Sequence, residues 1–289
     1  MTIKHLVLSA GSYKGLHMLG ALKYLEEIEY FSNNNIETVY AVSIGSLIGV
    51  LLAMKLELDD IIEYTINRPW EKLFNLTTDS FLNCVYSKGI LNINIFYSVF
   101  ENFFKKKKIS KKITMIEFYN TFNVALNFIT LNINTFKTEV LSHVNTPNLP
   151  IIEAVYMSCA LPFVFEPFEY KNNLYIDGGL VNPYPLKLCM EKHEDEEILS
   201  FFIKDQNKQS NVCPNDNIFK YGFFIFNNLM KKNRIDYIVE DFPNEILILA
   251  DEINMGDAMD SIGNIESRKK NINLGKNYAK LFIKYKNNK

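Results

Sequence analysis

Cysteine is scarce in this sequence, and its spacing does not suit a metal site. The four cysteines are Cys84, Cys159, Cys189 and Cys213. They include no Cys-x-x-Cys pair, and no histidine stands at the spacing of a zinc site. This pattern indicates a reducing compartment, and we expect neither a metal nor another cofactor.

The chain also lacks a long hydrophobic run. The longest one, Ala41 to Met54, is shorter than the ~18 residues that a membrane-spanning helix needs. Near the N-terminus, Leu6-Val7-Leu8 is too short for the core of a signal peptide. We therefore expect a cytoplasmic protein without a transmembrane segment, at most peripheral at membranes.

Neither sign of charge predominates in the sequence. There are 31 Lys and Arg residues against 33 Asp and Glu residues, which gives a formal net charge of -2. Nucleic-acid binding usually leaves a basic balance, so no nucleic-acid partner is expected. The 289 residues are 48% hydrophobic, enough for the core of one large α/β domain.

The N-terminal part alternates short apolar runs with helical patterns. Ile3 to Ser9 reads as a buried strand, and Gly11 to Gly15 as a tight turn into a helix that stops near Ser32. A second strand, Thr38 to Val42, precedes a helix at about 47–58. A β-α-β-α order predicts a parallel sheet covered by helices, with both turns at the carboxyl ends of adjacent strands.

The remaining sequence continues this mixture of strands and helices. Predicted strands are Val124 to Leu131 and Lys137 to His143 (a hairpin), Leu174 to Ile176, Ile198 to Ile203, and Glu245 to Leu249; predicted helices are Ile151 to Ser158, a segment starting near Asn182, and most of Asp257 to Lys286.

Residues 59–116 have a less regular pattern, which predicts an insertion or lid. Aromatic residues and then lysines are concentrated there: Phe81, Phe96, Tyr97, Phe100, Phe103, Phe104, Lys105 to Lys108, Lys111 and Lys112. One interpretation is a helix with a buried aromatic stripe and a solvated lysine end. The other is that 96–112 forms an aromatic and basic surface for peripheral contact with anionic lipid.

Ser43 is the candidate nucleophile. It follows the strand that ends at Val42, precedes a helix, and has the small residues Ala41 and Gly45 on either side. A sharp strand-to-helix turn of this kind exposes a serine hydroxyl to a substrate carbonyl. The alternative is a serine that only caps the helix.

A serine nucleophile needs a base, and no histidine is well placed to supply it. His5 lies at the wrong end of its strand, His17 lies among leucines, and His193 lies in an acidic run. His143 alone remains as an alternative. Asp177, on a glycine turn after a strand, can take the proton directly and completes a serine-aspartate dyad.

Three separated motifs occur in one order along the chain: Leu6 to Gly15, Ala41 to Gly45, and Asp177 to Gly179. The stretch Ala154 to Pro167 adds a Ser-x-Ala-x-Pro-x-x-Phe-x-Pro pattern. In these motifs, from about Ile3 to about Pro185, the sequence resembles the patatin-like phospholipase family.

The resemblance implies a role for each motif. Ser43 would be the nucleophile of a Gly-x-Ser-x-Gly elbow, here with Ala41 in place of the first glycine, and Asp177 the base. Supporting positions are Lys14, Gly15, Gly45, Gly178 and Gly179. Backbone N–H groups of Gly11, Ser12 and Tyr13 would form the oxyanion hole. The family loop has three glycines where this sequence has Ala10, Gly11 and Ser12.

The resemblance also implies an α/β fold of three layers, α/β/α, with a mostly parallel central sheet, helices on both faces and a helical insertion. We expect a patatin-like domain at 1–205, with the insertion at about 59–116, and a mainly helical extension of the same domain at 206–289. The implied activity is phospholipase A type hydrolysis of fatty acyl esters, without a metal.

Two other functions stay open. The altered glycine loop fits a catalytically weak or inactive lipid-binding or interaction module. The other alternative is phosphate or nucleotide binding at the first turn. The glycines there, at positions 11, 15 and 20, match neither Gly-x-Gly-x-x-Gly nor the P-loop.

Overall fold

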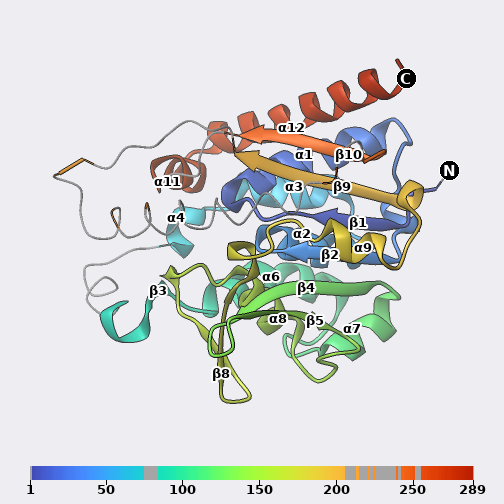
Figure 1. Cartoon of the computed structure of the whole chain (residues 1–289). Helices are drawn as coiled ribbons and strands as arrows, with labels where there is room; N and C mark the ends of the chain where they lie inside the picture. Colours follow the sequence, from blue (N-terminus) through green and yellow to red (C-terminus); the bar gives the residue numbers. More distant parts are fainter. Residues whose placement is uncertain are drawn as a thin grey trace.

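A mostly parallel sheet forms the centre of the protein in the computed structural model, which describes residues 2–74, 84–205, 213–214, 221, 224, 239, 242–250 and 255–288. Among these residues eight strands form the sheet, in the order β10-β9-β1-β2-β4-β8-β7, with β5 also paired to β4. Figure 1 shows β10, β9, β1, β2 and β4 in that order from top to bottom. The strands are β1 His5–Leu8, β2 Thr38–Val42, β4 Ala125–Asn132, β5 Lys137–Ser142, β7 Phe168–Tyr170, β8 Asn173–Asp177, β9 Ile198–Asp205 and β10 Glu245–Ala250.

The sheet is buried on both faces, which makes the fold three-layered. Alternate residues of a strand point to opposite faces, and in β1 Leu6 and Leu8 join one apolar cluster while Val7 joins another. The first cluster includes residues of α1 Gly15–Glu27, α2 Ile44–Ala53 and α8 Ile151–Cys159, and the second includes residues of α9 Leu186–Met190. The predicted fold class is therefore confirmed.

The predicted elements of the N-terminal part are confirmed, with one shift in position. Strand β2 has the predicted bounds, and α1 follows the turn at Gly11 to Gly15. The helix after Ser43 begins at Ile44 and ends at Ala53, earlier than the predicted 47–58. A second helix, α3 Leu58–Asn67, begins where that prediction ended.

The described residues of the segment 59–116, which are 59–74 and 84–116, are mainly helical and pack against the domain. They contain most of α3, then α4 Trp70–Leu73, β3 Gly89–Leu91, α6 Asn94–Lys107 and the start of α7 Met115–Phe122. Strand β3 pairs in parallel with β6 Phe163–Phe165, a second small sheet that the sequence pattern did not predict. Phe81 lies outside the described residues.

The aromatic residues of 96–112 do not form a surface. Phe96, Phe100, Phe103 and Phe104 are all buried in the main core. The interpretation of this segment as an aromatic lipid-contact surface is wrong in that respect, because the four rings lie on the face of α6 that packs inward. The lysines are the exposed part, and several pair with carboxylates: Lys105 and Lys111 with Glu101, Lys106 with Asp60, and Lys112 with Glu153.

The described residues of the C-terminal part add one strand and two helices. Strand β10 pairs in parallel with β9, and α11 Met255–Gly263 leads into α12 Ile265–Lys286, as the helical pattern of the tail predicted. Helix α12 lies along α1 and β10 (Figure 1). These contacts support our proposal that 206–289 extends the first domain. No helix among the described residues is long and apolar enough to cross a membrane.

Candidate active site

Two strands meet end to end at the centre of the site. Strand β2 runs parallel to β4 and its last residue, Val42, is opposite Ile129. Strand β8 runs antiparallel to β4 and its last residue, Asp177, is opposite Thr130. The carboxyl ends of β2 and β8 therefore meet beside neighbouring residues of β4. This places Asp177 next to Ser43, the residue that follows Val42.

Ser43 occupies the sharp turn between β2 and α2. Its φ of 56° and ψ of -129° are unusual for a residue with a side chain. The elbow is tight, because a side chain at Gly45 would overlap the backbone carbonyl of Leu8 in β1. The serine is half-buried, and the predicted strand, elbow and helix are all present.

Asp177 is in direct contact with the serine. The Ser43 hydroxyl donates to Asp177 Oδ2 at 2.6 Å, although the residues are 134 positions apart. The other carboxylate oxygen, Oδ1, accepts from the Gly179 N–H at 2.7 Å. The aspartate is 4% exposed, and its own N–H donates to the Ala160 carbonyl. The carboxylate is thus held from both sides with one oxygen on the serine.

The glycines after Asp177 allow a close approach between backbones. A Cβ at Gly178 would lie 2.5 Å from the Ile129 carbonyl oxygen, and one at Gly179 would lie 2.8 Å from the Ala10 Cβ. The turn therefore packs between β4 and the loop that follows β1.

Ser158 supports the elbow, a role that sequence reasoning missed. Its hydroxyl accepts from the Ser43 N–H at 3.0 Å and donates to the Ile129 carbonyl at 2.7 Å. It also shares a hydrogen bond with the Ser46 hydroxyl at 2.9 Å. Ser158 is the first residue of the Ser-x-Ala-x-Pro pattern. The sequence therefore singled the residue out, but it did not show that Ser158 contacts the Ser43 elbow.

The loop from Ala10 to Lys14 lies beside the elbow. Gly11 has an extended φ of 174°, and Ser12 has a left-handed φ of 52°. Residues Ser12–Lys14 form a 3-10 turn, η1, directly before α1. A Cβ at Gly15 would overlap the Ile44 side chain, so the start of α1 touches the residue after Ser43. Lys14 is 3% exposed, and its ammonium is 5.9 Å from the centre of the Tyr13 ring.

The histidines occupy other places in the described part of the chain. His143 stacks on Tyr119 of α7 with ring centres 4.0 Å apart. His5 stacks on His193 at 3.6 Å, and His17 meets Tyr278 of α12 edge to face. Asp177 is the ionisable group that the described structure brings to Ser43.

Two of these histidines make the fold sensitive to acid. Burial lowers the pKa of His5 and of His17 to about 4. In the unfolded chain both would gain a proton near pH 6.5, so stability falls as pH drops from about 6.5 towards 4. We expect the thermal midpoint to fall between pH 7 and pH 5, and the fall to be smaller in His17→Leu. An equal fall in wild type and variant would contradict this origin.

Residues 6–190 match the family model described as patatin-like phospholipase. The chain belongs to the patatin-like phospholipase family. Such membership places it among lipid acyl hydrolases in general. The match ends at the last residue of α9, so β9, β10, α11 and α12 lie beyond it. Among the described residues, no cluster of three or more His, Cys, Asp or Glu side chains has the arrangement of a metal site.

Two viral relatives resemble this patatin-like chain. "Uncharacterized protein R571" of Acanthamoeba polyphaga mimivirus is 28% identical over 236 residues, which are 82% of this chain and 78% of the relative. "Probable lipid hydrolase 463L" of Invertebrate iridescent virus 6 is 32% identical over 197 residues, 66% of this chain and 64% of the relative.

A solved structure shares the patatin-like fold. The crystal structure of VipD from Legionella pneumophila matches with a TM-score of 0.60 at 16% sequence identity, over 99% of this chain and 67% of that protein. At this identity the likeness concerns the fold alone.

Proposed function

We propose that the protein is a phospholipase A type acyl hydrolase in which Ser43 is the nucleophile and Asp177 is the general base. The observation that carries this proposal is the 2.6 Å hydrogen bond from the Ser43 hydroxyl to Asp177 Oδ2. A nucleophile and its base must lie within hydrogen-bond reach of each other. A serine that only capped α2 would bond its own helix, and the Ser43 side chain makes no such cap.

The dyad would act in two steps. Ser43 Oγ attacks the ester carbonyl carbon while its proton passes to Asp177 Oδ2, and the tetrahedral intermediate expels the alcohol, which leaves with that proton. Water then attacks the acyl-serine, gives a proton to Asp177, and releases the fatty acid as Ser43 recovers its proton. The proposed steps use water and groups of the chain, and no cofactor.

The loop at Gly11, Ser12 and Tyr13 would supply the oxyanion hole. Within the described residues, no hydrogen bond is found from the Gly11 or Ser12 N–H to another group. These donors lie before the N-terminus of α1, where the peptide dipoles favour a negative charge. Of the two positions where the family has glycine and this chain does not, Ala10 does not have a left-handed backbone and Ser12 does, so only the change at position 12 leaves a strained residue. Lys14, Gly15 and Gly45 would hold loop and elbow together.

The proposal is tested by fatty acid release from phosphatidylcholine vesicles. The wild-type protein should release fatty acid and lysophospholipid, whereas Ser43→Ala should not. A second serine variant, Ser142→Ala, removes a buried hydroxyl at the end of β5 and serves as the control. A folded wild-type protein that binds vesicles without hydrolysis would favour the alternative, a catalytically inactive lipid-binding module.

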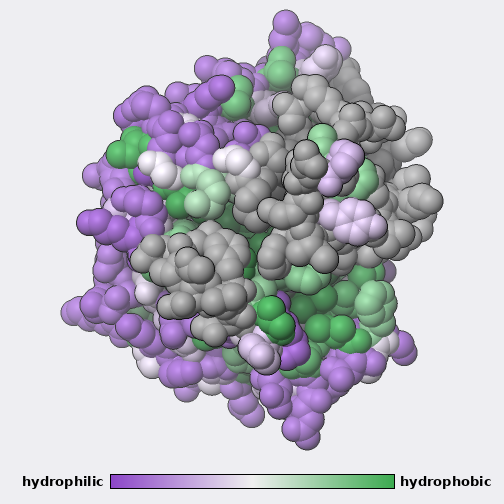
Figure 2. All heavy atoms as spheres, turned by 90° about the vertical axis from the view of Figure 1, so that its left-hand side faces the viewer, coloured by the Kyte–Doolittle hydropathy of each residue, from purple (hydrophilic) through white to green (hydrophobic). Residues whose placement is uncertain are grey.

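Lipid contact would occur next to the site. Val85, Tyr86 and Phe163 are 77%, 85% and 47% exposed, and β3 and β6 join their two segments. Phe163 lies three residues after Ala160, whose carbonyl accepts from the Asp177 N–H. Figure 2 views the face that lies at the left in Figure 1, where β9 and β10 end, and shows hydrophobic residues gathered in part of that face. Exposed aromatic and apolar residues around a lipid-cleaving site suit insertion between lipid headgroups.

The double variant Tyr86→Ser/Phe163→Asn should bind anionic vesicles about 10-fold or more weakly, because two apolar side chains no longer leave water. Neutralising Lys105 to Lys108 should have the smaller effect. Flotation of both variants with vesicles measures this. The opposite ranking would return membrane contact to the lysine side of 96–112.

A further inference from the structure

The oxyanion loop touches a part of the chain that lies beyond the family match. The Tyr13 hydroxyl donates to Asp257 Oδ2 at 3.3 Å, across 244 positions of sequence. Asp257 lies in the first turn of α11. Helix α11 also contacts η1, the 3-10 turn that contains Tyr13. The loop proposed to hold the oxyanion is thus joined to the C-terminal helices by a side-chain contact.

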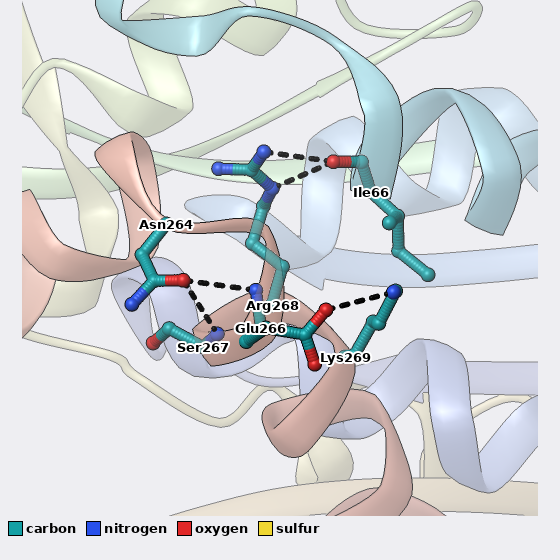
Figure 3. A network of polar contacts seen from close by, with 6 residues as sticks. All are labelled: Ile66, Asn264, Glu266, Ser267, Arg268 and Lys269. Carbon is teal, nitrogen blue, oxygen red and sulfur yellow. Dashed lines mark hydrogen bonds and ion pairs between the residues drawn. The ribbon is translucent and has the colours of Figure 1, made fainter.

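Helix α11 is itself held firmly by Arg268. The arginine is 3% exposed, and its Nε and Nη2 donate to the Ile66 carbonyl at 2.9 Å and 2.8 Å. Figure 3 shows this pair of bonds, together with the Asn264 side chain that caps the start of α12. On its other side, Nη1 donates to the carbonyls of Ser261 and Ile262 in α11. One guanidinium therefore joins the carboxyl ends of α3 and α11.

The loop has a reason to need such support. Ser12 holds a left-handed backbone without being glycine, and strained conformations of this kind persist only where surrounding contacts determine them. On one side β9 supplies those contacts, since the Ser9 N–H donates to the Phe201 carbonyl and the Ile203 N–H donates to the Ser9 hydroxyl. From the α11 side, Asp257 holds Tyr13, the residue that follows Ser12.

We infer that Asp257 is a positioning residue for ester hydrolysis, and that α11, anchored by Arg268, keeps the strained loop in shape through the Tyr13 hydroxyl. The inference rests on the proposed function. In a loop with fewer glycines, side-chain contacts of this kind compensate for backbone angles that glycine would adopt freely.

Kinetics of single and double variants test the inference. Tyr13→Phe and Asp257→Ala should each lower kcat by about 3- to 10-fold, the value of one hydrogen bond, with little change in KM or thermal midpoint. The double variant should be no slower than either single one, since both remove the same contact. Asp257→Asn should keep most of the rate, because its amide oxygen still accepts from Tyr13.

The matched control is Glu266→Ala. This carboxylate is also exposed and near the start of a C-terminal helix, but its side chain pairs with Lys269. It should leave kcat unchanged. Additive losses in the double variant, or equal losses in Glu266→Ala, would overturn the positioning role.

Hydrogen exchange separates this inference from the proposed function. The Lys14 amide, which donates to the Gly11 carbonyl at 3.1 Å, should exchange faster in Tyr13→Phe and in Asp257→Ala than in the wild type, and at the wild-type rate in Glu266→Ala. This readout does not depend on hydrolysis. An inactive wild type with the expected exchange pattern would contradict the proposed hydrolase function but not the support of the loop by Asp257. Unchanged exchange in both variants would contradict that support.

Discussion

Asp177→Asn is expected to lower kcat/KM for ester hydrolysis by about 10³- to 10⁴-fold, because an amide cannot take the proton of the serine. The substitution keeps the size and shape of the side chain. Its oxygen can still accept from the Gly179 N–H, a bond that measures 2.7 Å in the wild type. The fold should therefore survive, and the thermal midpoint should stay close to that of the wild type.

Several companion variants make this result specific. Ser43→Ala should be as inactive as Asp177→Asn, and the double variant no worse than either, because the two groups act as a unit. Asp195→Asn is the matched control, since Asp195 lies in the 3-10 turn before β9, at the opposite end of the sheet from the site. Substantial hydrolysis by a folded Asp177→Asn protein would contradict the dyad and return His143 to consideration.

Gly275→Ala should cause a large loss in the free energy of unfolding. Helices α1 and α12 cross so closely that a Cβ on Gly275 would overlap the His17 carbonyl, and a Cβ on Gly20 would overlap the Ile272 carbonyl. Each glycine thus faces a backbone atom, which cannot rotate away as a side chain can. Alanine favours a helix by about 1 kcal/mol over glycine, but the overlap forces the helices apart.

The expected net loss is about 3 kcal/mol, which corresponds to a fall of roughly 6 to 12 °C in the thermal midpoint. Thermal unfolding followed by circular dichroism measures it. Gly263→Ala is the control, because a Cβ there would meet nothing within 4 Å. Equal midpoints for the two variants would mean that the crossing of α1 and α12 is not as close as described.

The local elements of the site could be predicted from sequence because their signals are local. Strand β2 has its predicted bounds, and the small residues Ala41 and Gly45 indicated the elbow. The buried stripe of α6 was also visible, since Phe96, Phe100 and Phe103 recur at helical spacing. The aromatic surface interpretation overlooked that this period places all three on one inward face.

The contacts between distant segments could not be predicted in this way. Nothing in the spacing of Ser43 and Asp177 shows that β2 and β8 end opposite neighbouring residues of β4. The chemistry of a serine without a suitable histidine, together with the family resemblance, paired the two residues. The three-residue strands β3 and β6 are too short for a periodic signal. The bond between Tyr13 and Asp257 depends on where α11 docks, which the amphipathic pattern of a helix does not determine.

Labelling with a fluorophosphonate tests the central proposal most directly, because this reagent bonds to a serine oxygen only where the serine is activated. The wild type should carry one adduct, on Ser43, when the labelled protein is mapped by mass spectrometry. Ser43→Ala should carry none, and Asp177→Asn should label far more slowly. A folded wild type that remains unlabelled, or an adduct on another serine, would contradict Ser43 as the nucleophile.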